Sequence, residues 1–209
     1  MLDVTVAIAA LIVLSPLLVL IFLSIRLSMG RPALFRQTRA GYRGKPFKVL
    51  KFRTLTQSCD SDGNLLPDVD RRTPLGDFLR RWSLDEFPQL WNVIRGEMSL
   101  VGPRPLLLEY LQKYTPEQAR RHDMKPGLTG WAQLHGRQNL LFSKRLEMDV
   151  WYVDQWSLLL DLKLIFRTLL QLHKLSAAGA TPDIDKTDDL GLFALIQKRK
   201  KDGNPASLP

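Results

Sequence analysis

The longest apolar stretch of the chain lies near its beginning. No charged residue occurs between Asp3 and Arg26, and fifteen of the 22 positions from Val4 to Ile25 are Leu, Ile, Val or Phe. As a straight helix this segment would be roughly 33 Å long, enough to cross a hydrocarbon core of about 30 Å. A cleaved signal peptide is not expected, because no basic region precedes the run and no small-residue cleavage site follows it. The pattern predicts a membrane helix, either spanning or re-entrant.

Ser15-Pro16 lies near the middle of this segment. Proline removes one backbone hydrogen bond and clashes with the carbonyl four residues before it, so we expect a kink there. The serine hydroxyl can satisfy a freed carbonyl. Kinked spanning helices and re-entrant helices both agree with this pattern. Nine basic residues follow and predict a cytoplasmic location for the main domain: Arg26, Arg31, Arg36, Arg39, Arg43, Lys45, Lys48, Lys51 and Arg53.

The middle of the chain alternates short apolar segments with turn residues. Two extended segments around a glycine turn predict a hairpin, Ala33–Thr38 and Pro46–Thr54 around Gly41–Gly44. A polar loop is expected at Cys59–Arg72 and an irregular glycine-rich segment at Pro126–Gly136. Helical patterns cover four stretches: Leu75–Trp82, Phe87–Ile94 with Arg95-Gly96 ending it, Pro105–Tyr114 and Pro116–His122.

The segment Trp156–Leu175 is again apolar, with eleven Leu, Ile or Phe residues among twenty and charged residues between them. It fits an interfacial helix with snorkelling cations, and it fits a buried core helix as well. We therefore predict an α+β fold, mostly helical, with a small β-hairpin and amphipathic interfacial helices. Its parts are a membrane helix at 1–26, a catalytic domain seated on the membrane at 27–175, and a linker and tail at 176–209.

The net charge of the chain indicates an anionic partner but does not identify which kind. The chain has 30 Lys and Arg against 21 Asp and Glu, a net charge of +9. This excess suits nucleic acid, an acidic lipid surface or a phosphorylated substrate. A single cysteine, Cys59, excludes an intramolecular disulfide and a multi-cysteine zinc site, and the three histidines have no metal-ligand spacing.

Two adjacent carboxylates, Asp85 and Glu86, lie at the predicted start of a helix. Ser83 and Glu86 have the spacing of a capping box, which would make the pair structural. Pro88 weakens that register, because its ring would clash with the carbonyl of Leu84. In either register, backbone N–H groups at a helix N-terminus favour anions. Adjacent residues point about 100° apart, so the two carboxylates would have different roles.

Arginines surround this pair in the sequence: Arg80, Arg81, Arg95 and Arg104. Pro103 and Pro105 stiffen the backbone on both sides of Arg104, which suits a fixed phosphate contact, although a simple exposed turn explains the same pattern. Carboxylates and arginines beside a membrane segment indicate phosphoryl transfer, with Mg²⁺ and with Asp or Glu as a covalent acceptor.

Several ordered sequence blocks together resemble one family, the monotopic phosphoglycosyl transferases, or bacterial sugar transferases. The resemblance runs from about Asp3 to Leu175. Its blocks are the apolar run with Ser15-Pro16, the segments 35–41 and 47–54, Ser83-Leu84-Asp85-Glu86-Phe87-Pro88-Gln89-Leu90-Trp91-Asn92-Val93, 96–105 with Gly102-Pro103-Arg104-Pro105, and 126–133 with Gly136-Arg137. Leu55, Lys125 and His135 depart from the usual pattern, which bears on sugar specificity rather than on the reaction.

The resemblance implies a reaction in two steps at the cytoplasmic face of a bacterial inner membrane. Asp85 attacks the β-phosphorus of a UDP-sugar and releases UMP, and a polyprenol phosphate such as undecaprenyl phosphate then takes the sugar phosphate, the first membrane step of glycoconjugate assembly. Glu86 is the second catalytic residue, Mg²⁺ is the cofactor with Asp85 as its candidate ligand, and the Ser15-Pro16 kink makes the first helix re-entrant. The candidate phosphate contacts are Lys51, Arg53, Arg80, Arg104 and Arg137.

The sequence gives less support to two other functions. A nucleic-acid-binding adaptor would use the positive charge, but no RNA-recognition or zinc-finger pattern occurs and carboxylates lie among the arginines. We therefore expect no nucleic acid among the partners, which are a UDP-sugar, a polyprenol phosphate and membrane lipid; oligomers are compatible with the sequence. A lipid-phosphate hydrolase lacks support, because no Gly-x-Ser-x-Gly nucleophile motif is present.

Overall fold

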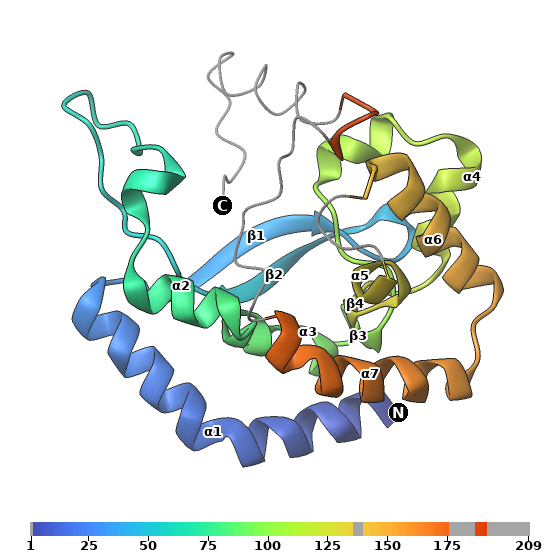
Figure 1. The fold of residues 1–209 in the computed structure, drawn as a ribbon, viewed down its shortest axis with the longest axis horizontal. Helices are drawn as coiled ribbons and strands as arrows, with labels where there is room; N and C mark the ends of the chain where they lie inside the picture. The colour runs from blue at the N-terminus through green and yellow to red at the C-terminus, as the bar shows by residue number, and fades with distance from the viewer. Residues whose placement is uncertain (1, 136–139, 176–186, 192–209) are drawn as a thin grey trace.

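The structure is a computed structural model that describes residues 2–135, 140–175 and 187–191. As predicted, the fold is α+β and mostly helical (Figure 1). Its helices are α1 (Leu2–Ser28), α2 (Pro74–Arg81), α3 (Leu90–Ile94), α4 (Pro116–Ala119), α5 (Trp131–His135), α6 (Phe142–Asp154) and α7 (Leu158–Leu175). Its strands are β1 (Leu34–Ala40), β2 (Pro46–Phe52), β3 (Ser99–Val101) and β4 (Gly127–Thr129), and 3₁₀ turns occupy Tyr42–Gly44, Asp68–Arg71, Leu84–Gln89, Leu108–Gln112 and Arg120–Asp123.

The predicted hairpin is present and forms the centre of the domain. Strands β1 and β2 pair antiparallel, with Leu34 opposite Phe52 and Ala40 opposite Pro46. The side chain of Asn92 on α3 fixes the outer edge of β2, because its Oδ1 accepts from Leu50 N at 3.1 Å and its Nδ2 donates to the Lys48 carbonyl at 2.8 Å. The hairpin and α3 are therefore held together.

The glycine-rich segment after Pro126 is regular, and the expectation of an irregular segment was wrong. Strand β4 pairs parallel with β3, with Ser99 opposite Gly127 and Val101 opposite Thr129, and α5 follows directly. The cause is close backbone packing: a Cβ atom at Gly127 would lie 2.0 Å from Gly102 N, and one at Gly130 would lie 2.2 Å from Gly102 O. Glycine is required here because two main-chain segments touch.

Helix α1 is continuous across Pro16 and bent near its middle, and both of its ends lie against the domain (Figure 1). The Ser15 hydroxyl donates to the Ile12 carbonyl at 2.8 Å, which is the carbonyl that Pro16 leaves without its N–H partner. Ala7, in the first half, packs with Phe47, Val49, Leu90, Val93 and Met98. Ile21 and Ile25, in the second half, pack with Ala33, Phe52 and Leu79. The kink and the role of the serine are confirmed.

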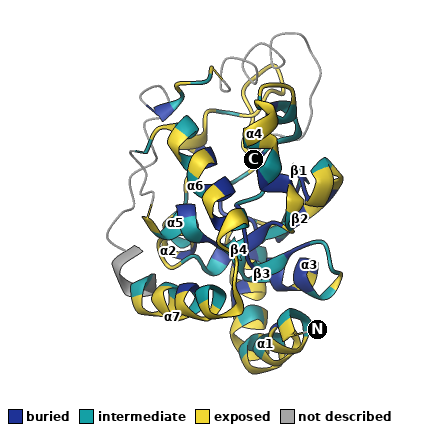
Figure 2. Cartoon of the chain, turned by 90° about the vertical axis from the view of Figure 1, so that its right-hand side faces the viewer, coloured by how far each residue is buried: buried dark blue, intermediate teal, exposed yellow. Residues whose placement is uncertain are grey.

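The outer side of α1 is apolar and exposed, with Ile12, Val13 and Leu20 each more than 60% accessible. Among the described residues, α1 is the one helix long and apolar enough to cross a membrane. Helix α7 lies along the same edge of the molecule (Figure 2). Leu164 of α7 is buried, whereas Leu159 and Phe166 are each 62% exposed. The interpretation of α7 as a buried core helix is therefore wrong. The other interpretation, an interfacial helix, agrees with these exposed apolar side chains.

Among the other predicted helices and loops, several are shorter in the structure than predicted. The helix predicted at Leu75–Trp82 is α2. The one predicted at Phe87–Ile94 is a 3₁₀ turn that continues into α3, and Gly96 follows the end of α3 with φ +74°. The stretch from Pro105 to Tyr114 contains only the 3₁₀ turn Leu108–Gln112. The loop predicted at Cys59–Arg72 is present and contains the 3₁₀ turn Asp68–Arg71. Most of the predicted linker and tail, 176–186 and 192–209, lies outside the described residues.

Candidate active site

Asp85 and Glu86 lie in the 3₁₀ turn Leu84–Gln89, which packs against β2. Ser83 does not cap a helix with its side chain; it adopts a left-handed conformation at φ +54°, and its carbonyl accepts from Glu86 N at 3.2 Å. The capping-box interpretation was therefore wrong. The physical reason is that Pro88 disfavours an α-helical register through Leu84, while the Glu86 carboxylate has stronger partners elsewhere.

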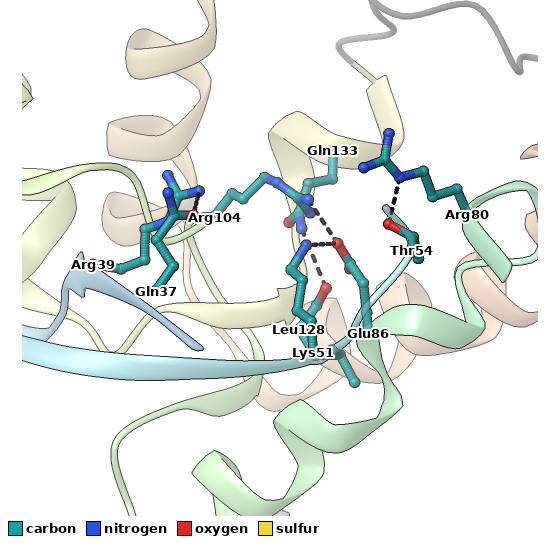
Figure 3. A network of polar contacts seen from close by, with 9 residues as sticks. All are labelled: Gln37, Arg39, Lys51, Thr54, Arg80, Glu86, Arg104, Leu128 and Gln133. Atoms are coloured by element: carbon teal, nitrogen blue, oxygen red, sulfur yellow. Dashed lines mark hydrogen bonds and ion pairs between the residues drawn. The ribbon is translucent and has the colours of Figure 1, made fainter. Parts of the chain in front are cut away.

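Those partners are two cations from other parts of the chain. Oε1 of Glu86 accepts from Lys51 Nζ on β2 at 2.7 Å and from Arg104 Nη2 at 2.7 Å (Figure 3). Burial alone would raise the pKa of Glu86, but Arg104 and Lys51 hold the pKa of this carboxyl well below its usual range. Glu86 is therefore a permanent anion that fixes two cations beside Asp85.

Asp85 has the opposite electrostatic environment. The residue is 9% exposed, and burial raises the pKa of its carboxyl to about 6, with a further contribution from the charge of Glu86. Lys51 and Arg104 act in the other direction and keep the shift moderate. Among the described residues, the Asp85 carboxylate has no hydrogen-bond or ion-pair partner. At neutral pH it is an ionised and poorly solvated carboxylate, which is the state that a nucleophile needs.

A cavity of about 220 Å³ opens beside Asp85. Its cationic wall comes from residues on several elements: Arg39, Lys51, Arg53, Arg71 and Arg80. Arg80 on α2 is held in place because its Nε donates to Thr54 Oγ1 at 2.8 Å (Figure 3). A carboxylate at one wall and guanidinium groups at the others suit a phosphorylated ligand, whose charge the arginines can neutralise.

The predicted phosphate contacts do not all have the same surroundings. Lys51, Arg80 and Arg104 lie around the carboxylate pair, and their phosphate contacts remain predictions. Arg53 borders the cavity, but its guanidinium donates to the carbonyl of Arg31 at 3.0 Å, to that of Gly30 at 3.0 Å and to that of Met29. These bonds hold the end of α1 against the domain, so Arg53 has a structural function here. Its phosphate contact remains a prediction. Arg137 lies outside the described residues.

The sequence reasoning missed three residues of the cavity on strand β1. Phe35, Gln37 and Arg39 all line it, and Arg39 donates to Gln37 Oε1. Arg104 lies nearby, and burial together with this neighbouring charge lowers the pKa of Arg39 to about 10. The sequence could have indicated these residues, because they are every second residue of a predicted strand and therefore face the same side.

The described residues contain no group of three or more His, Cys, Asp or Glu side chains that could hold a metal ion. Mg²⁺ nevertheless fits this site in the way it commonly binds phosphates, through one or two carboxylates together with phosphate oxygens of the substrate. Asp85 offers a free carboxylate toward the cavity, whereas one oxygen of Glu86 already serves two cations. Asp85 is therefore the residue that would hold the ion.

Comparison with known proteins gives one consistent result. The sequence profile of the family described as bacterial sugar transferase matches residues 1–174. An uncharacterized sugar transferase of Bacillus subtilis, EpsL, is 52% identical over 167 residues, which cover 80% of this chain and 83% of that protein. The UDP-glucose:undecaprenyl-phosphate glucose-1-phosphate transferase of Caulobacter vibrioides is 45% identical over 80% of this chain and 67% of its own length. The Escherichia coli protein of the same name is 40% identical, and the match spans 39% of its length.

Proposed function

The chain belongs to the bacterial sugar transferase family, and we propose that it transfers a sugar-1-phosphate from a UDP-sugar to a polyprenol phosphate with release of UMP. The observation that carries this proposal is the environment of Asp85, an unpaired and poorly solvated carboxylate at the wall of a cationic cavity. The names of the relatives from Caulobacter vibrioides and Escherichia coli support undecaprenyl phosphate as the acceptor and UDP-glucose as the first donor to test.

In the first step, a carboxylate oxygen of Asp85 attacks the β-phosphorus of the donor. The bond between this phosphorus and the oxygen that bridges to the α-phosphorus breaks, and UMP leaves with the electron pair. The sugar phosphate is then held on Asp85 as a mixed anhydride. Arg80 and Arg104 neutralise negative charge on the transferred group, and Glu86 keeps Arg104 and Lys51 in position.

In the second step, a phosphate oxygen of the polyprenol phosphate attacks the same phosphorus. The bond to Asp85 breaks, the carboxylate is regenerated, and the product is a sugar-diphospho-polyprenol. Bound Mg²⁺ would contribute charge neutralisation on the diphosphate of the donor. The residues of the chain supply the nucleophile and the fixed cations around it, so catalysis depends mainly on positioning and electrostatics.

We further propose that the domain is seated on the cytoplasmic face of the membrane, with α1 entering and leaving on that face. The bend at Pro16 and the packing of both ends of α1 against one domain support this topology. Labelling with a thiol reagent that does not cross the membrane tests the cytoplasmic location of the domain, because Cys59 is the single cysteine and is exposed. Reaction of Cys59 in intact cells would contradict the cytoplasmic location.

The reaction is tested with purified protein, UDP-glucose and Mg²⁺ in the absence of acceptor. We expect release of UMP up to one equivalent per protein molecule, and an intact mass increased by one hexose phosphate. Addition of undecaprenyl phosphate should discharge the adduct and restart UMP release. Asp85→Asn should give neither UMP nor adduct. Multiple turnovers of UMP release without acceptor, or product formation by the Asp85→Asn variant, would contradict the covalent mechanism.

A further inference from the structure

A buried ion pair lies next to the backbone of Arg104. Arg121, in the 3₁₀ turn before β4, and Asp149, on α6, have side chains that are 1% and 4% exposed. Nε and Nη2 of Arg121 both donate to Asp149 Oδ2, at 3.0 and 2.7 Å. Removal of two charges from water is costly, and a buried ion pair is often no more stable than well-packed apolar residues. Stability alone is thus a weak explanation for this pair.

The same guanidinium has a third contact that leads to the active site. Nη2 of Arg121 donates to the main-chain carbonyl of Arg104 at 2.6 Å. The side chain of Arg104 in turn donates to Glu86 at 2.7 Å. A chain of hydrogen bonds therefore runs from Asp149 through Arg121 and Arg104 to the carboxylate beside the proposed nucleophile.

Strand β4 already holds the backbone just before Arg104 by hydrogen bonds. The bond from Arg121 adds a further contact to this segment. Gly102 N donates to the Thr129 carbonyl at 2.9 Å, and Gly127 N donates to the Pro103 carbonyl at 3.0 Å. Pro103 and Pro105 restrict rotation on both sides of Arg104. With its carbonyl fixed by Arg121, the direction in which the Arg104 side chain leaves the backbone is determined.

We propose that Arg121 and Asp149 are positioning residues, which orient Arg104 toward the transferred phosphate by holding its main-chain carbonyl. This inference rests on the proposed function, because the rate that it concerns is that of UMP release. Asp149 accepts hydrogen bonds from Nε and Nη2 of Arg121, and Nη2 also donates to the carbonyl of Arg104. The pair acts through Arg104 and has no substrate contact of its own.

The first test is Arg121→Lys, which keeps a positive charge for Asp149 but loses the planar fork that bridges two acceptors. We expect kcat of UMP release to fall about tenfold or more, because small displacements of positioning groups have effects of this size. KM for the donor should change far less. The matched control is Asp154→Asn, since the Arg120–Asp154 ion pair joins the same turn to the same helix but is exposed and has no contact with Arg104. A normal kcat in Arg121→Lys would overturn the proposal.

The second test separates positioning from stability. Arg121→Met combined with Asp149→Leu removes both charges together, which should leave the fold stable. We expect this double variant to unfold near the wild-type temperature and still to release UMP slowly. Wild-type kcat in the double variant would mean that the pair contributes only to folding, and would overturn the inference.

The third test is a double-mutant cycle with Arg104→Gln. If Arg121 acts through Arg104, the loss caused by Arg121→Lys should disappear when Arg104 is already replaced. Multiplication of the two losses would overturn the proposal. Failure of the proposed function is distinguishable from either result, because the wild-type protein would then release no UMP from UDP-sugars.

Discussion

The carboxylate of Asp85 is buried beside a second carboxylate, and its replacement by asparagine is expected to stabilise the folded protein. The pKa of this group is raised from 3.8 to about 6, chiefly by burial and then by Glu86. Each unit of such a shift corresponds to about 1.4 kcal/mol of preference for the protonated form, so ionisation of Asp85 in the folded state costs about 3 kcal/mol at neutral pH. Asp85→Asn removes this cost because the amide carries no charge.

The sign of the pH dependence follows from the direction of the shift. A carboxyl whose pKa is raised by folding binds its proton more tightly in the folded state, so rising pH destabilises the fold until it passes the folded pKa. The stability gained by Asp85→Asn should therefore be full above about pH 7, roughly half at pH 5 and nearly absent below pH 4. For a chain of this size, about 3 kcal/mol corresponds to roughly 6–12 °C in Tm.

The assay is thermal unfolding in detergent at a series of pH values, without donor and with a chelator so that no Mg²⁺ binds Asp85. The matched control is Asp62→Asn, which makes the same chemical change at an exposed loop position. Asp85→Asn should be inactive in UMP release and more stable than the wild type at pH 8. A Tm at pH 8 equal to or below that of the wild type, with Asp62→Asn unchanged, would refute the electrostatic description of the site.

Three further predictions test other parts of the structure. Glu86→Gln removes a charge that raises the pKa of Asp85, so the acidic limb of kcat/KM for UMP release should move below about pH 6; an unmoved limb would contradict this. Arg53→Ala should lower the free energy of unfolding by about 2–4 kcal/mol, measured by chemical denaturation, because three carbonyls lose a charged donor; an unchanged value would favour the predicted phosphate contact. Pro16→Ala should straighten α1, so that a cysteine introduced by Leu2→Cys becomes accessible from the periplasmic side. Unchanged labelling would show that the bend does not depend on proline.

Local patterns predicted most of the elements. The apolar run with Ser15-Pro16 gave a kinked helix, and the alternation on either side of Gly41–Gly44 gave the hairpin, because each depends on residues close together in the sequence. The adjacent Asp85 and Glu86 could be recognised as a candidate site for the same reason. Their different electrostatic environments agree with adjacent side chains that point in different directions, about 120° apart in a 3₁₀ turn.

Local sequence patterns could not predict contacts between residues far apart in the chain. The parallel pairing of β3 with β4 joins residues nearly thirty positions apart, and no local periodicity indicates it. Arg53 looked like its basic neighbours in the sequence, yet its burial against the end of α1 gives it another function. Arg121 and Asp149 are separated by 28 positions and had no signal at all, since a charged residue in a polar segment normally faces water.

The bend of α1 has a consequence for the lipid around the protein. Under the proposed topology, the exposed leucines and valines of its outer side displace acyl chains in the inner leaflet only, so the protein adds lateral area to one monolayer and none to the other. Such a one-sided wedge is accommodated best where the inner leaflet is loosely packed. Vesicle size and headgroup packing should therefore control how much of the protein is bound, independently of how well its cavity accepts a sugar nucleotide.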